Sequence, residues 1–131
     1  MEKEYRKVNG NVSFIKYHFV FCTRYKRKIF NIQGVKERTI ELIKNECELL
    51  QINLCYIKCD INHVYLILEA LPTISASEMM QKIKNNTSGK IREEFEELSK
   101  IPSLWTRKFF VSTEINNEEE IQKFINEQKT R

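Results

Sequence analysis

A histidine and a tyrosine two residues apart, His63 and Tyr65, are the side chains of this sequence with the clearest chemical potential. The stretch 61–70 alternates between polar or aromatic residues and aliphatic ones, which is typical of a half-buried strand. Side chains two apart on a strand point to the same side and can serve one ligand. The pattern falls one residue short of a His-hydrophobic-His metal site, because a tyrosine stands where the second histidine would be.

A second chemical feature is the basic run 24–28, which contains an aromatic residue. Its members are Arg24, Tyr25, Lys26, Arg27 and Lys28. Lysine and arginine bind backbone phosphates, and a tyrosine ring stacks on an unpaired base. The run therefore favours a nucleic-acid contact, with a charged loop anchored in the core by Tyr25 as the alternative. Three further cations, Lys82, Lys84 and Lys90, are weaker candidates for the same contact.

The charge of the chain is uneven along its length. Residues 1–30 hold eight Lys or Arg against two Glu, a net charge of +6, so the other residues sum to −2 within the total of +4. A basic first part beside a nearly neutral body favours a surface that faces phosphates. A solvated charged surface explains the same numbers without any ligand.

Length and composition predict one globular domain, 1–131. The longest apolar run has only the length of a strand, so we expect no transmembrane helix, no signal peptide and a cytoplasmic location. The cysteines form no Cys-x-x-Cys pair and lie in periodic apolar segments; they are Cys22, Cys47, Cys55 and Cys59. We interpret them as reduced core residues and not as a disulfide or zinc set.

Hydrophobic periodicity predicts four strands and three helices around these features. The predicted strands are Phe14–Thr23, Ile52–Lys58, His63–Ala70 and Arg107–Thr113. The predicted helices run from about Asn31 to Leu50, from Ser75 to about Leu98, and from Asn117 onward. This order predicts an α+β fold, a four-stranded antiparallel sheet with helices on one face, of the ferredoxin-like type.

Local signals refine these elements. Ser75 and Glu78 form a capping box at the start of the second helix, and Asn117 precedes three acids that favour the start of the third. The stretch 85–89 contains poor helix formers, which predicts a kink or break there. Residues 1–12 are polar, and we expect them to be loose or to form an edge segment.

Five segments together resemble the single-tyrosine HUH transposases of small bacterial insertion sequences. They are Tyr17–Lys28, Asp60–Ile67, Ile101–Trp105, Phe109–Thr113 and Phe124–Gln128, and they follow the order of that family along nearly the whole chain. The resemblance implies a metal held by two strand histidines and a polar residue of the last helix. It also implies a helix tyrosine that forms a phosphotyrosine link to single-stranded DNA, recognition of imperfect hairpins, and a dimer.

Carried over position by position, the resemblance implies a damaged catalytic site. His63 matches the first histidine and Gln128 the helix ligand, whereas Tyr65 replaces the second histidine. Phe124 occupies the position of the nucleophilic tyrosine, and a phenyl ring has no oxygen with which to attack. We expect no cofactor; Mg or Mn would be the metal of any residual site. Whether His18 faces this site depends on a strand register that the sequence does not fix.

These observations predict a catalytically inactive transposase-like protein that binds hairpin-containing DNA or RNA as a homodimer, without a membrane. Two alternatives stay open. The first is an active transposase or nickase that acts on single-stranded DNA hairpins through a rearranged site, with Tyr65 or another tyrosine as nucleophile. The second is a dimerisation module that modulates an intact transposase. The sequence does not distinguish a DNA target from an RNA target.

Overall fold

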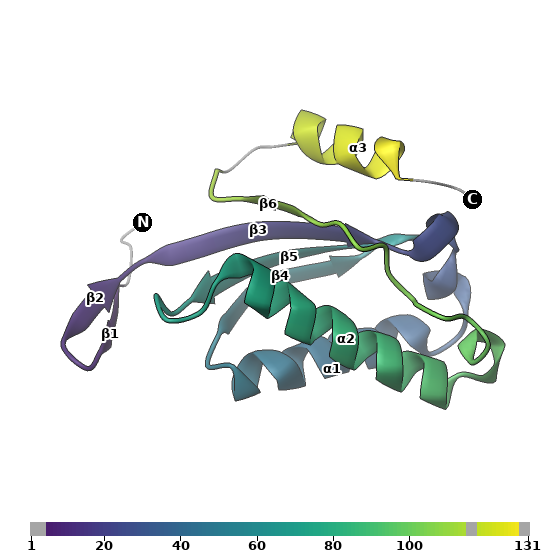
Figure 1. Ribbon diagram of the computed structural model, residues 1–131, viewed down its shortest axis with the longest axis horizontal. Helices are drawn as coiled ribbons and strands as arrows, with labels where there is room; N and C mark the ends of the chain where they lie inside the picture. The colour runs from purple at the N-terminus through teal and green to yellow at the C-terminus, as the bar shows by residue number, and fades with distance from the viewer. Residues whose placement is uncertain (1–4, 115–117, 129–131) are drawn as a thin grey trace.

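A four-stranded antiparallel sheet is the centre of the computed structural model, which describes residues 5–114 and 118–128 (Figure 1). Its strands, in spatial order, are β4 (Asn53–Cys59), β5 (His63–Ala70), β3 (Ile15–Cys22) and β6 (Phe110–Ser112). Every neighbouring pair is antiparallel, and β4 and β5 form the predicted hairpin. The predicted α+β class with a four-stranded antiparallel sheet is confirmed.

Two helices cover one face of this sheet. They are α1 (Val35–Leu49) and α2 (Ala76–Glu94), which lie side by side beneath the strands in Figure 1. The large side chains of alternate strand positions, such as Phe19, Phe21 and Leu66, are fully buried against them. Burial of such side chains is the main stabilising contribution in a domain of this size.

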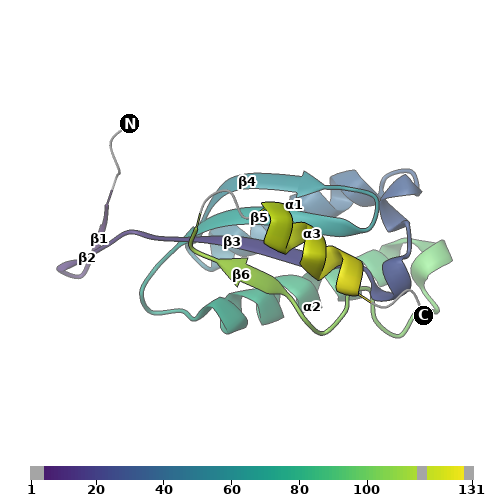
Figure 2. The ribbon, with the colours of Figure 1, turned by 90° about the horizontal axis from the view of Figure 1, so that it is seen from above.

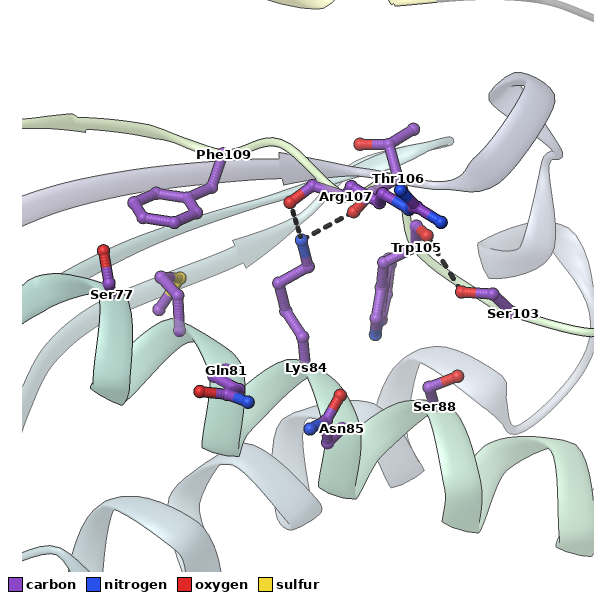
Figure 3. A pocket seen from close by; sticks show the side chains of 11 residues that line it. Ser77, Gln81, Lys84, Asn85, Ser88, Ser103, Trp105, Thr106, Arg107 and Phe109 are labelled. Carbon is purple, nitrogen blue, oxygen red and sulfur yellow. Dashed lines mark hydrogen bonds between the residues drawn. The ribbon is translucent and has the colours of Figure 1, made fainter.

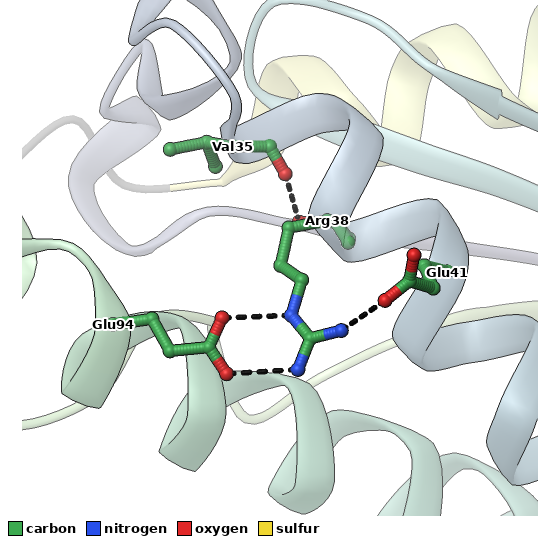
Figure 4. Close-up of polar contacts among 5 residues, drawn as sticks. Val35, Arg38, Glu41 and Glu94 are labelled. Carbon is green, nitrogen blue, oxygen red and sulfur yellow. Dashed lines mark hydrogen bonds and ion pairs between the residues drawn. The ribbon is translucent and has the colours of Figure 1, made fainter.

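An ion pair joins the two helices at their solvent side (Figure 4). Arg38 of α1 donates to both carboxylate oxygens of Glu94 of α2, at 2.7 and 2.9 Å, and also contacts Glu41. The hydrogen bond to Arg38 lowers the pKa of Glu94. This contact joins α1 and α2 at the surface. In the core, the two helices are held together by their buried apolar side chains.

The third helix, α3 (Glu118–Glu127), packs against the opposite face of the sheet (Figures 1 and 2). Its buried Ile125 contacts Val20 and Cys22 of β3, and its partly buried Ile121 and Phe124 complete this second apolar cluster. The prediction placed the helices on one face. That holds for α1 and α2, whereas α3 forms a third layer.

The N-terminal segment forms a hairpin where a loose or edge segment was expected. Strands β1 (Arg6–Val8) and β2 (Asn11–Ser13) pair with each other and extend away from the main sheet (Figure 2). The turn between them is Asn9–Gly10, with φ angles of 52° and 83°. An Asn-Gly pair with two positive φ angles is the preferred two-residue hairpin turn.

The helix α1 begins later than predicted. A short 3₁₀ turn occupies Ile29–Asn31, and α1 starts at Val35 after Gly34, whose φ is 89°. This left-handed conformation is one that glycine adopts without steric cost, and it redirects the chain into the helix.

The helix α2 is continuous through 85–89, so the predicted kink or break is wrong. The Thr87 hydroxyl donates to the Ile83 carbonyl at 2.8 Å, and both Thr87 and Ser88 are buried. Tertiary bonds add to this burial, since Trp105 Nε1 donates to Thr87 Oγ1 and the Leu104 amide donates to Ser88 Oγ, and together they outweigh the weak helix propensity of the stretch. The predicted cap is confirmed, since Ser75 Oγ accepts from the Glu78 amide at 3.1 Å. The helix ends at Glu94 and not near Leu98, because Phe95 has an extended backbone.

The last strand is shorter than the predicted Arg107–Thr113, because part of that backbone has another partner. The ammonium of Lys84 in α2 donates hydrogen bonds to the carbonyls of Thr106 and Arg107, at 2.6 and 3.2 Å. The carbonyls of residues 106–108 therefore face α2, and Phe110–Ser112 form the ladder with β3. The predicted cap Asn117 lies outside the described residues.

Three of the four cysteines are buried as predicted, and Cys55 is exposed, which corrects the prediction for that residue. All four are free thiols in the described part of the chain. Within residues 5–114 and 118–128, no helix has both the length and the apolar character needed to cross a membrane.

Candidate nucleic-acid interface

The face of the sheet that carries α3 gathers the side chains with chemical potential. His63 and Tyr65 share this face of β5, as the alternation predicted, and β3 adds His18. The register pairs His18 with Ile67 and Cys22 with His63, which directs the histidine of β3 toward the tyrosine. His18 Nδ1 and the Tyr65 hydroxyl are 2.8 Å apart. This distance settles the orientation of His18, which the sequence left open.

Burial sets the protonation of this His18–Tyr65 pair. It lowers the pKa of His18, and the charge of Lys16 lowers it further, so the imidazole is neutral at neutral pH. Burial also raises the pKa of Tyr65, with Tyr56 and Glu118 adding to the effect. The pair is therefore a neutral hydrogen bond between a phenol and an imidazole.

His63 has its own polar neighbours at the start of β5. Its Nδ1 is 3.2 Å from Asn62 Oδ1, and its Nε2 is 4.0 Å from Asp60 Oδ2. Burial lowers the pKa of His63, although the carboxylate of Asp60 opposes this shift. These contacts hold the ring without any exogenous ligand.

Of the two positions singled out by the sequence near the C-terminal end, Phe124 lies in α3 and Gln128 directly follows that helix. The Phe124 ring packs on Phe110 with a centroid distance of 6.1 Å. The side-chain amide of Gln128 donates to the Phe124 carbonyl at 3.0 Å, back along its own helix. Both residues line the same cavity, described below.

The donors near this face do not fit a divalent metal. In the described ranges, no group of three or more His, Cys, Asp or Glu side chains is placed to hold an ion. Tyr65 is a protonated phenol bonded to His18, and the Gln128 amide nitrogen bonds to its own helix. A divalent metal prefers imidazole or carboxylate ligands over these groups. We therefore assign no chemical step to a metal.

The basic run forms a tight turn directly after β3. Tyr25 and Lys26 have positive φ angles of 59° and 54°, an uncommon conformation for residues with side chains. The guanidinium groups of Arg24 and Arg27 lie 5.9 and 5.2 Å from the centroid of the Tyr25 ring. Tyr25 is 42% exposed, so it does not anchor the turn in the core. The turn instead presents an aromatic ring between two cations.

Hydrogen bonds fix this turn to its surroundings. The Thr23 hydroxyl lies 2.8 Å from the Arg27 carbonyl, to which it donates, and the Arg24 amide donates to the Leu104 carbonyl at 2.9 Å. The ammonium of Lys26 donates to the Asn126 carbonyl of α3 at 3.3 Å. The turn is thus attached both to the segment before β6 and to the end of α3.

These three elements enclose a cavity of about 460 Å³. Its lining consists of Arg24, Tyr25, Thr106, Arg107, Lys108, Phe124, Glu127 and Gln128. Arg107 and Lys108 were not predicted as site residues from the sequence, in which they mark only the start of a strand. The sequence does show two adjacent cations here, which could have indicated a phosphate contact. That they lie beside the basic turn follows only from the tertiary structure.

The three lysines of α2 have different environments. Lys84 lines a second cavity, of about 290 Å³, and points to the carbonyls of 106–108 (Figure 3). Burial lowers its pKa to about 8. Lys82 and Lys90 are exposed on α2, on the side of the sheet away from α3. The structure therefore does not bring these lysines together with the basic turn.

Comparisons with known proteins agree on one family. A family model described as "Transposase IS200 like" matches residues 11–128. The transposase for insertion sequence element IS200 of Salmonella typhimurium is 30% identical over 117 residues, which cover 86% of this chain and 76% of that protein. The corresponding transposase of Salmonella typhi gives the same values.

Solved structures share the fold. A candidate transposase from Deinococcus radiodurans R1 superposes with a TM-score of 0.89 at 19% identity, covering 96% of this chain and 99% of that chain. A REP-associated tyrosine transposase bound to a REP hairpin gives a TM-score of 0.60 at 12% identity, over 93% of this chain and 68% of that chain.

Proposed function

Because this chain belongs to the family of IS200-like transposases, we propose that it is a catalytically inactive member that binds hairpin-containing DNA or RNA. We further propose that it acts as a homodimer in the cytoplasm. The observation that carries the proposal is the cavity at which cations of two segments meet Phe124 of α3. Cations and aromatic rings serve nucleic-acid binding, whereas a phenyl group cannot serve nucleophilic attack.

Loss of catalysis follows from the atoms at the family's functional positions. A phosphotyrosine link needs a hydroxyl at position 124, where the phenyl ring of Phe124 packs on Phe110. The missing oxygen abolishes the covalent step outright, in contrast to a substitution that only weakens a contact. Tyr65 at the second ligand position is engaged with His18 and supplies no strong metal ligand.

Nucleic-acid binding is supported by the arrangement of cations. Arg24, Arg107 and Lys108 line one cavity, and Lys28 is exposed on the adjoining turn. Arginine and lysine attract phosphates independently of sequence. A relative of the same fold was solved with a REP hairpin bound. We therefore propose a stem-loop with unpaired nucleotides as the ligand, without a requirement for a divalent metal.

The direct test is charge reversal on the turn. Substituting Arg24, Arg27 and Lys28 together by Glu should abolish binding of a tailed stem-loop at physiological salt. A matched control substitutes Lys36 and Lys44 of α1 and Lys7 of the N-terminal hairpin by Glu, which makes the same change in net charge outside the turn and outside the cavity lining. Equal affinity of both variants would exclude this interface. Binding that survives chelation of divalent metals is expected for the unmodified protein.

One observation favours a second candidate, an enzyme that uses Tyr65 as nucleophile. His18 Nδ1 lies within hydrogen-bond distance of the Tyr65 hydroxyl, as a general base would. The raised pKa of Tyr65 and its apolar neighbours Phe110 and Phe124 oppose this candidate. This candidate predicts that the protein forms a covalent adduct with a single-stranded DNA hairpin and that the Tyr65→Phe variant forms none.

A complementary variant tests whether the scaffold itself is competent. The double substitution Phe124→Tyr and Tyr65→His restores the family's side chains at both positions. Metal-dependent cleavage by this variant, with none by the parent, would support an intact scaffold with a lost site. Cleavage by the unmodified protein would contradict the proposed inactivity.

Crosslinking in the native cells identifies the target. Sequencing of the nucleic acid recovered with the protein should give an enriched stem-loop. A transcript would establish an RNA target, and hairpin DNA at repeated element ends would establish a DNA target. Recovery of background alone would favour the module that only dimerises with an intact relative.

A further inference from the structure

The cavity beside α3 has a lining that suits one part of a nucleic acid in particular. It combines three cations from two segments, Arg24, Arg107 and Lys108, with the aromatic rings of Tyr25 and Phe124. Its volume of about 460 Å³ lies within the usual range of about 300–1,000 Å³ for sites that take small molecules. A phosphate suits the cations, and the flat face of a base suits the rings.

We propose that this cavity takes one unpaired nucleotide of the bound nucleic acid, with its base against Tyr25 and Phe124 and its phosphate at Arg24, Arg107 and Lys108. The inference rests on the proposed function and specifies which part of the ligand this site binds. It gives Phe124 a role of its own, because a phenyl ring keeps the stacking surface of a tyrosine without the reactive hydroxyl.

The Tyr25 wall is held in place before any ligand arrives. The backbone at Tyr25 and Lys26 is left-handed, and the guanidinium groups of Arg24 and Arg27 lie 5.9 and 5.2 Å from the centroid of the Tyr25 ring. Ordering an arginine or tyrosine side chain on binding has an entropic cost, so a pre-ordered ring favours affinity. The 42% exposure of Tyr25 leaves ring surface for a base.

The other two walls are connected to the first. Lys26 bonds to the Asn126 carbonyl, which sets the end of α3 against the turn. The Thr106 amide donates to the Cys22 carbonyl at 2.9 Å, which sets the start of the 106–108 segment against the end of β3. Glu127 adds one carboxylate to the lining, and the three cations outweigh it. The cavity therefore keeps a positive side for a phosphate.

The Phe124 wall has apolar support and a polar neighbour. Phe110 of β6 packs behind the ring at 6.1 Å, so the ring cannot turn freely into the sheet. Gln128 donates its amide nitrogen to the Phe124 carbonyl, which leaves its amide oxygen as an acceptor on the cavity wall. A base edge with an exocyclic amine would find an acceptor there.

The test uses two DNA probes, a stem-loop with a single-stranded tail and the same stem-loop cut flush. A fluorescent adenine analogue, quenched by stacking, replaces one unpaired position of the tail at a time. Binding of the wild-type protein should quench one position more than its neighbours. Phe124→Leu and Tyr25→Leu should each remove this quenching and weaken binding of the tailed probe about tenfold, with little change for the flush probe.

Three controls separate stacking from folding and charge. Phe124→Tyr keeps a ring and should restore both quenching and affinity relative to Phe124→Leu. Tyr56→Leu removes another exposed tyrosine, 47% exposed on β4 and outside the cavity lining, and should behave as wild type. The melting temperature of each variant shows whether α3 still packs on the sheet. Tyr25 lies outside the apolar cluster that holds α3, so Tyr25→Leu tests stacking without removing a side chain from that cluster.

The outcomes distinguish this inference from the proposed function. Salt-sensitive binding of both probes, with no quenched position and no effect of either leucine variant, would overturn the nucleotide site while leaving hairpin binding intact. Binding of neither probe would overturn both. A free mononucleotide that occupies the site with the same affinity as the tailed probe would show that the ligand is not part of a chain, which also contradicts the proposal.

Discussion

At the residue scale, the hydrogen bond between Tyr65 and His18 limits the chemistry that either side chain can perform. Tyr65 stands where the resemblance implies a histidine, and its hydroxyl has a defined partner in His18 at 2.8 Å. A neutral imidazole and a protonated phenol satisfy each other within an apolar surrounding, which avoids the cost of a buried unpaired polar group. The fold thus accommodates the Tyr65 side chain through its hydrogen bond with His18.

A buried hydrogen bond at the other face of the sheet permits a measurable prediction. Trp105 Nε1 donates to Thr87 Oγ1 at 2.8 Å, and both residues are buried. Thr87→Val keeps the shape but leaves the indole donor without its partner, which should lower the free energy of unfolding by about 1–3 kcal/mol. Chemical denaturation of both proteins gives this difference. Thr87→Ser retains the hydroxyl and should lose less; an equal loss in both variants would contradict the assignment.

At the residue level, the sequence predicted the pairs that lie on one strand and missed those that depend on two. His63 and Tyr65 share a face because strand alternation is local. His18 joins them only through the register of β3 against β5. Arg107 and Lys108 approach Arg24 because the chain returns to the end of β3 more than eighty positions later, which no local pattern encodes.

At the level of elements, one lysine holds the 106–108 segment on α2. The ammonium of Lys84 donates to the carbonyls of Thr106 and Arg107, and this segment carries two of the cations of the cavity. The bond explains both the short β6 and the position of the cations. Lys84 itself is therefore a positioning residue for the candidate interface.

The lowered pKa of Lys84 predicts a pH-dependent stability. Its pKa is about 8 in the folded protein against 10.5 ordinarily, so between these values the unfolded chain binds more protons than the folded one. The free energy of unfolding of the wild type should therefore rise with pH from about 8 to about 10.5 relative to Lys84→Met. Denaturation of both proteins across this range measures the difference. A difference that does not change with pH would contradict the lowered pKa.

The elements themselves were predictable to the extent that their signals are local. The alternation of β5 and the Ser75 cap gave correct elements. The continuity of α2 was not predictable from helix propensity, because buried contacts of Thr87 and Ser88 outweigh it. The side on which α3 packs has a signal in β3, where Val20 and Cys22 are apolar on the face opposite Phe19 and Phe21. Apolar residues on both faces of a strand indicate that both faces are covered.

At the scale of the whole molecule, cations from two segments distant in sequence meet beside one cavity. The excess of cations in residues 1–30 contributes the basic turn, and the fold adds Arg107 and Lys108 to it. The acids of α3 at Glu118, Glu119 and Glu120 lie at the other end of that helix. The basic turn after β3, together with Arg107 and Lys108, thus forms a cationic end of the sheet next to the cavity, which under the proposed function would attract a nucleic acid.

This concentration predicts how binding depends on salt. Each cation that neutralises a phosphate contributes about 0.7 to the slope of log affinity against log salt concentration on a single strand. Arg24→Gln, Arg107→Gln and Lys108→Gln should each reduce the slope for a tailed stem-loop by about this amount, and jointly by the sum if each cation meets its own phosphate. Lys44→Gln, exposed on α1 and outside the cavity lining, removes the same charge and should leave the slope unchanged. Titrations at several salt concentrations measure the slopes. Equal reductions in all four variants would mean that only the net charge of the protein matters, and the cationic end would then have no special place in binding.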